Sequence, residues 1–400
     1  MNIKYFDHAA TTSVNEDVLK EMIPYFKMNF GNASSMYSIG RKSKKAIEDS
    51  REKIAKAINC KNANEIYFTA CGSESDNLAI KGIAYANKDK GNHIITSKIE
   101  HPAVLNTCKS LEKDGFKVTY LNVNEKGFIN LEELKNSIND NTILITIMFA
   151  NNEIGTIEPI KEIGLIAKEK NVIFHTDSVQ AIGNIKIDVQ ELNIDALSMS
   201  AHKFYGPKGG GALYIKNGIK FEKIQDGGHQ EKNKRAGTEN VPGIVGMGKA
   251  IERIYDRFEE YNKKLIDLRE YLLNSVEKNI KYTTINGDRE KRLPGNANIS
   301  FKFVQGEDLL LKLDFKGICA SSGSACTSGS MEPSHVLMAI GCKHEDAQSA
   351  LRITIGEENT KEDIDYLVEN LVEIVEELRS ISPQYKAFLE ENNCEKEYII

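Results

Sequence analysis

A lysine that directly follows an apolar run is the first residue whose position suggests chemistry. Lys203 comes after the run 196–199 and before a turn of glycine, proline and lysine at 206–211. Glycines let a backbone turn sharply, and a lysine in a polar pocket at a strand end can form an imine with an aldehyde cofactor. A lysine in a glycine-rich loop is more often a solvated surface residue, so its neighbours decide between the two interpretations.

Asp177 is the first candidate neighbour, because it ends the apolar run 172–176. An unpaired carboxylate in a buried strand would be costly. The pyridine nitrogen of a cofactor such as pyridoxal 5′-phosphate (PLP) requires an acid of this kind, which keeps the ring protonated and electron-withdrawing. The alternative is that Asp177 caps the next helix.

A phosphate seat is indicated after the run 66–69, where Gly72 and Ser73 precede a helical pattern. Backbone N–H groups at a helix start, together with a serine hydroxyl, can hold a phosphate. Ser73 and Asp76 would equally suit an ordinary N-cap, and the two interpretations do not exclude each other.

His101 follows another apolar run, 93–96, and precedes a proline that suits the first turn of a helix. An imidazole at this place could stack on a flat ring or move protons. Cys326 lies in a polar run of small residues, 320–330. A thiol in such a hydroxyl-rich loop is more readily ionised than a buried one and could carry sulfur to an acceptor; the alternative is a solvated loop with an incidental cysteine.

The elements that must position these residues alternate between apolar runs and amphipathic segments. The expected strands are 66–69, 93–96, 117–120, 142–149, 172–174, 196–199 and 212–215, with helices at 74–87, 101–114 and 160–170 among those between them. This alternation predicts an α/β fold, with right-handed crossovers and a mainly parallel seven-stranded sheet that is covered on both faces. Ligands in such folds bind beyond the carboxyl ends of the strands, where the candidate residues lie.

The second half of the chain predicts a different architecture. Residues 249–286 contain neither glycine nor proline and repeat apolar residues at helical spacing, which indicates one long helix or two in near continuity. The further expected strands are 298–303, 317–320 and 352–355, and the further helices are 307–313 and 362–381. We therefore expect a large PLP-binding α/β domain at 13–255 and a small α+β domain formed by 1–12 and 256–400, which carries the Cys326 loop.

Composition excludes several classes of protein. The chain has 400 residues and a formal net charge of -6, without the basic patch of a nucleic-acid binder. No uncharged apolar run approaches the ~18 residues of a membrane span, no signal peptide is indicated, and the expected location is the cytoplasm. The seven cysteines form no C-x-x-C pair, so we expect reduced thiols and no metal site. Residues 243–249 match the start of a P-loop, but Ala250 lacks the required hydroxyl and no strand precedes them, so we expect close helix packing there.

Together the motifs resemble those of the cysteine desulfurases, the class V branch of PLP-dependent fold-type-I enzymes, and most closely the nitrogen-fixation type. The resemblance runs from Tyr5 to Pro383. Its motifs are Glu100-His101, Asn-Asn-Glu-Ile-Gly at 151–155, His-Thr-Asp-Ser-Val-Gln at 175–180, Ser-Ala-His-Lys at 200–203, Arg-Ala-Gly-Thr-Glu-Asn at 235–240 and Ser-Gly-Ser-Ala-Cys-Thr at 322–327. It implies PLP as cofactor, L-cysteine as substrate, a homodimer with sites at the interface, and an iron–sulfur scaffold protein as sulfur acceptor.

The resemblance also assigns roles to residues. Lys203 would hold PLP and move the substrate α-proton, and Cys326 would receive the sulfur. Around the ring, Asp177 would pair with the pyridine nitrogen, Gln180 would bond the phenolic oxygen and His101 would stack. The remaining assignments are Gly72, Ser73, Ser200, His202 and the partner's Thr238 for the cofactor phosphate, Asn152 for cofactor and substrate, and Asn32 and Arg352 for the substrate carboxylate.

Some positions depart from the family pattern, among them Ala33, Cys71 and the run 357–359, where Glu-Glu-Asn stands in place of Arg-Phe-Thr. Three alternatives accompany the assignment. A PLP aminotransferase on the same fold would not need the Cys326 thiol, whereas a selenocysteine-specific lyase could share the same site. A docking platform for sulfur acceptors would not need an intact Lys203 and Asp177.

Overall fold

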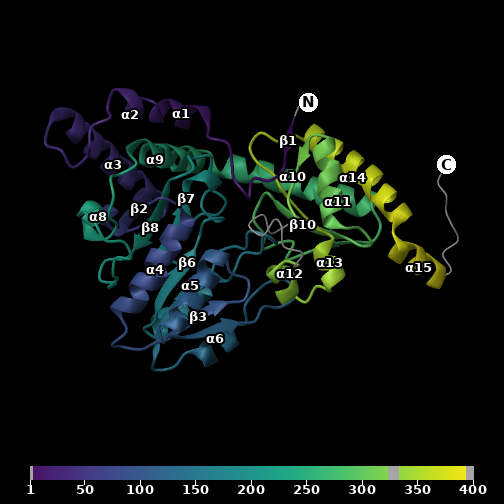
Figure 1. The fold of residues 1–400 in the computed structure, drawn as a ribbon, viewed down its shortest axis with the longest axis horizontal. Helices are drawn as coiled ribbons and strands as arrows, with labels where there is room; N and C mark the ends of the chain where they lie inside the picture. The colour runs from purple at the N-terminus through teal and green to yellow at the C-terminus, as the bar shows by residue number, and fades with distance from the viewer. Residues whose placement is uncertain (1–2, 323–332, 393–400) are drawn as a thin grey trace.

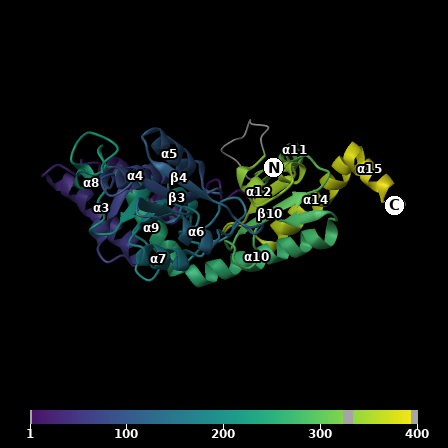
Figure 2. The same cartoon turned by 90° about the horizontal axis from the view of Figure 1, so that it is seen from below.

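The structure is a computed structural model that describes residues 3–322 and 333–392. It has two lobes of unequal size (Figure 1). The larger contains a seven-stranded sheet and the smaller a three-stranded sheet. Helix α10 (Phe258–Asn279) runs along one side of the molecule from the larger lobe to the smaller (Figure 2).

The seven-stranded sheet is mainly parallel, as expected. In spatial order its strands are β2 (Ile66–Thr69), β8 (Gly211–Ile215), β7 (Ala196–Ser200), β6 (Ile173–Asp177), β5 (Thr142–Thr146), β3 (His93–Ser97) and β4 (Lys117–Leu121). Only β8 is antiparallel to its neighbours, β2 and β7. Strands β2, β7, β6, β5 and β3 therefore point the same way, and their carboxyl ends meet at one edge of the sheet.

Alternate residues of these strands enter two separate hydrophobic clusters, because successive side chains of a strand point to opposite faces. Ile94 and Leu144 pack in one cluster, which also contains Leu78 of α4 (Gly72–Ala86). Their neighbours Ile95 and Ile145 pack in the other. The latter cluster includes residues of α3 (Ser38–Ala57), α7 (Ile160–Glu169) and α9 (Val241–Asp256). The sheet is thus covered on both faces, as predicted.

The run that resembles a P-loop is part of helix α9, which packs against α3. A Cβ atom added at Gly248 would lie only 2.7 Å from the Ser50 side chain of α3, and one added at Gly246 would lie 2.6 Å from the Met22 sulfur. Both distances are too short for a side chain to fit. The glycines therefore permit close helix packing, as the sequence indicated. The long helical pattern that begins in this region is two helices, since α9 ends at Asp256 and α10 starts at Phe258.

In the smaller lobe, β10 (Asn296–Phe301) lies between β9 (Thr283–Ile285) and β12 (Ala350–Thr354), antiparallel to both. Strand β1 (Lys4–Tyr5) pairs in parallel with β11 (Ile318–Cys319), so the N-terminus belongs to this lobe. The main helices are α11 (Gly306–Phe315) and α14 (Lys361–Ile381). The remaining α-helices of the described residues are α1 (Glu16–Met22), α2 (Pro24–Lys27), α5 (Pro102–Lys113), α6 (Leu131–Ser137), α8 (Gln230–Asn233), α12 (His335–Ala339), α13 (His344–Gln348) and α15 (Pro383–Glu391). Among the described residues, no helix has the length and apolar character that crossing a membrane requires.

Candidate active site

A cavity of about 330 Å³ opens at the sheet edge where the parallel strands end. Its volume lies within the range of roughly 300–1,000 Å³ that is usual for small-molecule sites. The expected site residues that line it are Gly72, Ser73, His101, Asn152, Asp177, Gln180, Ser200, His202, Lys203 and Arg352. Residues that are distant in the sequence thus meet in one cavity, most of them just beyond strand ends.

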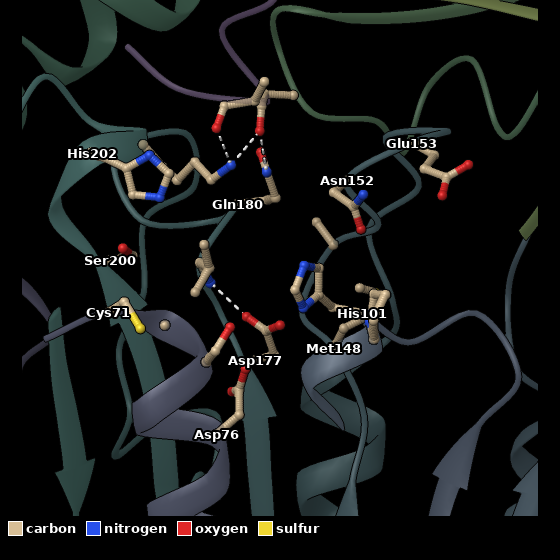
Figure 3. Close-up of a pocket in the computed structure, with 18 of the residues that line it drawn as sticks. Cys71, Asp76, His101, Met148, Asn152, Glu153, Asp177, Gln180, Ser200 and His202 are labelled. Carbon is tan, nitrogen blue, oxygen red and sulfur yellow. Dashed lines mark hydrogen bonds between the residues drawn. The ribbon is translucent and has the colours of Figure 1, made fainter. Parts of the chain in front are cut away.

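Asp177, the last residue of β6, lies at the base of this cavity between His101 and Ser200 (Figure 3). Its Oδ1 accepts a hydrogen bond from the Val179 N–H at 2.9 Å. Burial raises the pKa of Asp177, while the hydrogen bond from the Val179 N–H and the charge of Lys203 oppose this shift. A buried carboxylate in this position favours a cationic ligand group, which would offset the cost of burying its charge.

Asp76 lies beyond Asp177 and is a buried residue of the site that the sequence did not identify (Figure 3). Its Oδ1 lies 3.8 Å from Nε2 of His175, whose pKa burial lowers to about 3, so the pair is not ionic. Burial, and then the charge of Asp177, raise the pKa of Asp76 well above its usual value. The neutral form of Asp76 is therefore favoured, and the negative charge is concentrated on Asp177.

His101 is the N-cap of α5, and its Nδ1 accepts a hydrogen bond from the Ala103 N–H at 3.1 Å. Nδ1 is therefore unprotonated. Burial lowers the pKa of His101, so the neutral ring with its proton on Nε2 is favoured at neutral pH. A neutral imidazole on the wall of the cavity can stack on a flat ring, as the resemblance implied.

Lys203 ends the short 3-10 helix η2 (Ala201–Lys203), which directly follows strand β7. Its Nζ donates hydrogen bonds to the carbonyl oxygens of Ala9 and of Ala10, the latter at 2.8 Å. Gln180 Nε2 donates to the same Ala9 oxygen at 3.0 Å. The segment at 9–10 therefore holds the lysine amine and the glutamine amide on the same side of the cavity.

The phosphate end of the cavity is formed by the start of α4 and the end of β7. The structure places the N-cap of α4 at Cys71, so Ser73 is the second residue of the helix and not its cap. A Cβ added at Gly72 would lie 2.7 Å from the Val179 side chain, so glycine permits the close approach of these two residues of the cavity wall. The hydroxyl of Ser200 is buried and has no hydrogen-bond partner, which leaves it available to a bound group.

The opposite side of the cavity carries Arg352 of β12 in the smaller lobe. Its Nη2 contacts the Asp7 carboxylate at 2.8 Å and its Nη1 donates to the Asn152 carbonyl oxygen at 3.2 Å. His335 also lines the cavity, and its Nε2 lies 3.0 Å from the Glu100 carbonyl oxygen. No pattern of residue types singled out His335, because a histidine at the start of a helix is usually only a polar surface residue.

Two expected site residues that the structure describes do not line this cavity. Asn32 and Thr238 are exposed side chains of the same protomer and are not among the residues that line it. Cys326 lies outside the described residues, so the structure does not test its position.

The cavity fits PLP by the chemistry of its walls. The Lys203 amine can bond an aldehyde, and the buried Asp177 carboxylate can pair with a protonated pyridine nitrogen. The unpartnered Ser200 hydroxyl and the first turn of α4, which starts at Gly72, can hold a phosphate. His202 adds an imidazole to this end of the cavity, and burial, with the nearby charges of Lys203 and Lys208, lowers its pKa to about 4.

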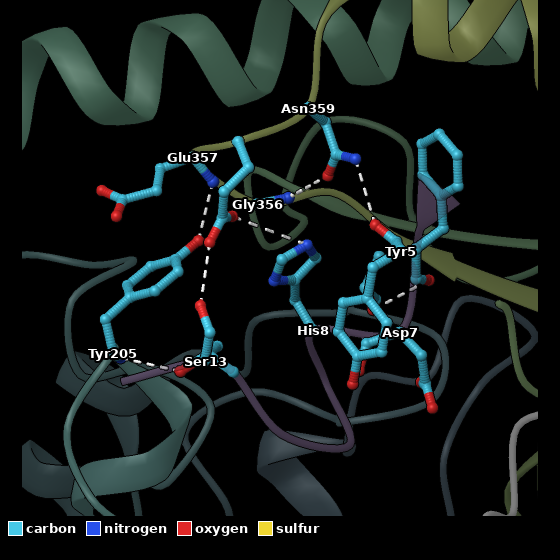
Figure 4. A network of polar contacts seen from close by, with 12 residues as sticks. Tyr5, Asp7, His8, Ser13, Tyr205, Gly356, Glu357 and Asn359 are labelled. Atoms are coloured by element: carbon cyan, nitrogen blue, oxygen red, sulfur yellow. Dashed lines mark hydrogen bonds and ion pairs between the residues drawn. The ribbon is translucent and has the colours of Figure 1, made fainter. Parts of the chain in front are cut away.

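The backbone after Lys203 is held by the smaller lobe (Figure 4). Tyr205 is 1% exposed and has a φ of 65°, which is unusual for a bulky residue. Its Oη accepts a hydrogen bond from the Glu357 N–H at 2.7 Å, and its own N–H donates to Thr12 Oγ1 at 2.9 Å. The Glu357 carboxylate contacts Arg253 at 2.7 Å, so the departure from the family pattern at 357–359 supplies a contact between the lobes.

We expect Tyr205→Phe to lower the free energy of unfolding by about 1–3 kcal/mol, because the part-buried Glu357 N–H would lose its acceptor, the buried Tyr205 hydroxyl. Denaturant unfolding of the apoprotein measures this change. The control is Tyr366→Phe, which removes an exposed hydroxyl that donates to the Lys316 carbonyl oxygen at 3.0 Å. Equal losses in the two variants would contradict the special role of the Tyr205 hydroxyl.

Comparison with known proteins agrees with this geometry. The model of the class-V aminotransferase family matches residues 4–367. The cysteine desulfurase IscS of Clostridium botulinum (strain Hall) is 57% identical to this chain, over 96% of the chain and 97% of that protein. A solved structure of a NifS-like protein has a TM-score of 0.88 at 38% identity and covers 94% of this chain and 99% of its own. A structure of SspA in complex with cysteine has a TM-score of 0.79 at 38% identity and covers 89% of this chain and 100% of its own.

These matches extend over nearly the whole of each chain, and they confirm the family that the motifs indicated. The class-V model alone would also include enzymes that transfer only an amino group. The relative at 57% identity narrows the assignment, because that protein is a cysteine desulfurase. The chain therefore belongs to the class-V aminotransferase family and, within it, to the PLP-dependent cysteine desulfurases.

Proposed function

We propose that this enzyme removes sulfur from L-cysteine, with Lys203 holding PLP and Cys326 receiving the sulfur as a persulfide. The observation that carries the proposal is one cavity that unites the Lys203 amine, the Asp177 carboxylate and the Arg352 guanidinium. These groups match an aldehyde, a pyridine nitrogen and a substrate carboxylate, respectively.

When bound, PLP withdraws electrons from the substrate α-carbon, so the proton on that carbon becomes easier to remove. Asp177 would keep the pyridine nitrogen protonated, and the neutral Asp76 beyond it would not compete for that cation. Gln180 would donate a hydrogen bond to the phenolic oxygen, and His101 would stack on the ring. The phosphate would be held by Ser73, Ser200, His202 and the start of α4 at Gly72, with Asn152 as a further contact.

The remaining steps concern the substrate itself. Arg352, assisted by Asn152 and Asn32, would hold the substrate carboxylate as a charge-assisted partner. The Lys203 amine would move the α-proton. The Cys326 thiolate would then attack the sulfur of L-cysteine, so that an S–S bond forms, the C–S bond breaks and the β-carbon takes a proton. L-Cysteine and the Cys326 thiol thus become L-alanine and the Cys326 persulfide, with no further reductant needed.

A homodimer is part of this proposal, and an exposed apolar segment supports it. Large apolar side chains at 23–37 are exposed by 47–88%: Ile23, Phe26, Met28, Phe30, Met36 and Tyr37. Several exposed large apolar side chains in one short segment are typical of an interaction surface. Asn32 lies in the same segment, and Thr238 is exposed elsewhere on the larger lobe. Contact with a second copy would bring Thr238 of the partner subunit to the cofactor phosphate and would cover the apolar segment.

Three further elements of the proposal rest on the family assignment. The acceptor of the persulfide sulfur would be an iron–sulfur scaffold protein, and the enzyme would act in the cytoplasm. Residues 13–255 would form the large domain, while 1–12 and 256–400 would form the small one. The separate hydrophobic clusters of the two lobes support this division.

Product analysis tests the proposed activity directly. Purified holoenzyme with L-cysteine and dithiothreitol should release alanine and sulfide in equal amounts. Formation of a keto acid from L-cysteine without sulfide would favour an aminotransferase. Turnover of selenocysteine alone would favour a selenocysteine lyase, and a protein that binds no PLP and releases no alanine would favour a docking platform.

A further inference from the structure

A strained arm carries Thr238 on the surface of the larger lobe. We define this arm as residues 229–240; it contains α8 (Figure 1). Three consecutive residues in it, Glu231, Lys232 and Asn233, have φ values of 44°, 59° and 62°. L-residues adopt this left-handed conformation singly and at a cost, so a run of three requires outside support.

The support is a buried ion pair. The Arg51 Nη1 and Nη2 atoms each donate a hydrogen bond of 2.8 Å to a different Glu231 carboxylate oxygen. This bidentate geometry is typical of strong ion pairs. The side chains are 3% and 4% exposed. Glu231 also accepts from the Phe68 N–H at 2.8 Å, and the Arg51 guanidinium lies 4.7 Å from the Phe68 ring centre. The arm is therefore fixed to β2, the strand that leads to the phosphate end of the cavity.

Two further residues of the arm, both after Glu231 in the chain, also fix it to the larger lobe. Lys232 Nζ donates to the Asn64 carbonyl oxygen at 2.7 Å and lies 4.6 Å from the Tyr67 ring centre. Arg235 Nε donates to the Glu74 carboxylate, in the first turn of α4, at 2.7 Å. Thr238 follows these anchors and remains exposed.

We propose that the Arg51–Glu231 pair positions Thr238: it holds the arm in its strained conformation so that Thr238 reaches the cofactor phosphate bound by a second copy of the chain. The proposal rests on the proposed homodimer and on the contact of Thr238 with the partner's cofactor. It assigns to Arg51 and Glu231, which do not line the cavity, a role in positioning a residue at the partner subunit's site. A strained backbone with three side-chain anchors is expected where the exact placement of an exposed residue matters.

PLP affinity of the apoenzyme, followed by the visible absorbance of the bound cofactor, gives the first test. Glu231→Gln and Thr238→Val should each weaken PLP binding about 10-fold, as the loss of a hydrogen bond to a charged group would. The double variant should be no weaker than either single variant, because both remove the same contact. The control is Glu48→Gln, since Glu48 also contacts Arg51 but is half exposed; its effect should be about twofold or less.

The outcomes separate this proposal from the one on which it rests. Native affinity in Thr238→Val would overturn both the contact with the partner's cofactor and the positioning role. Weak binding in Thr238→Val with native affinity in Glu231→Gln would overturn the positioning role alone, and so would additive losses in the double variant. If Glu231→Gln does not fold, Lys232→Ala removes an exposed anchor of the arm and should also weaken binding, non-additively with Thr238→Val.

Hybrid dimers test whether the effect acts in trans. The first hybrid pairs a Glu231→Gln subunit with a Lys203→Ala subunit. Only the Glu231→Gln subunit can link PLP to a lysine, and this cofactor would contact Thr238 on the intact arm of the Lys203→Ala subunit. The PLP affinity of this site should be native. The second hybrid pairs a native subunit with a Glu231→Gln/Lys203→Ala subunit. The native subunit then has the only site with Lys203, this site faces the altered arm of its partner, and it should bind PLP about 10-fold more weakly. The reverse ranking of the two hybrids would contradict the proposal.

Discussion

Lys203→Ala is expected to abolish alanine and sulfide release to the background of the assay. The variant would lose both the amine that bonds the cofactor and the group that moves the α-proton. Loss of a general base alone costs about 10²–10⁴-fold, and here the covalent link is lost as well. Borohydride reduction, which should fix PLP to the peptide that contains Lys203 in the native enzyme, should fix none in the variant.

Lys208→Ala provides the control for this experiment. Lys208 is exposed in the turn that follows Lys203 and does not line the cavity. The control should therefore keep the cofactor link and the native rate of turnover. Sulfide production that persists in Lys203→Ala would overturn the assignment of Lys203.

Asp177→Asn is expected to lower kcat by about 10²–10³-fold, the usual cost of removing one preorganised electrostatic partner of the reacting groups. Asparagine has the shape of aspartate but no charge, so it would not keep the pyridine nitrogen protonated. The steady-state rate of alanine release measures the effect. The cofactor link to Lys203 should survive, because the amine is unchanged.

The matched control is Asp76→Asn. Burial and the charge of Asp177 raise the pKa of Asp76, so asparagine resembles the neutral form that the site already favours. This variant should lose much less activity than Asp177→Asn. A similar loss in both variants would contradict the assignment of the negative charge to Asp177.

The placement of most site residues was predictable because they follow strand ends. Apolar runs indicate the strands, and the residues that follow parallel strands lie at the same edge of the sheet, as Asp177 and Lys203 do. Some expected strand boundaries differ from those in the structure, and the reason is physical. The apolar run 142–149 continues past the end of β5 at Thr146, because the next residues are also buried and Met148 lines the cavity. Apolar composition therefore indicated burial and not the strand itself.

Other features depend on three-dimensional packing that local patterns do not contain. Asp76 is compatible in sequence with a helix cap, yet the packing of α4 on the sheet buries it beside Asp177. The left-handed backbone of Tyr205 and of residues 231–233 depends on contacts with residues far along the chain, such as Glu357 and Arg51. No pattern of residue types near these positions specifies such contacts.

The transfer of sulfur from L-cysteine to Cys326 is the central claim, and a single turnover tests it most directly. Holoenzyme is mixed with one equivalent of L-cysteine per site in the absence of reductant, and alanine and the mass of the peptide that contains Cys326 are measured. The prediction is one alanine per site and one added sulfur on Cys326 in the native enzyme, with neither product in Cys326→Ala. Equal alanine release by both proteins, or sulfur found on another cysteine such as Cys71, would contradict it.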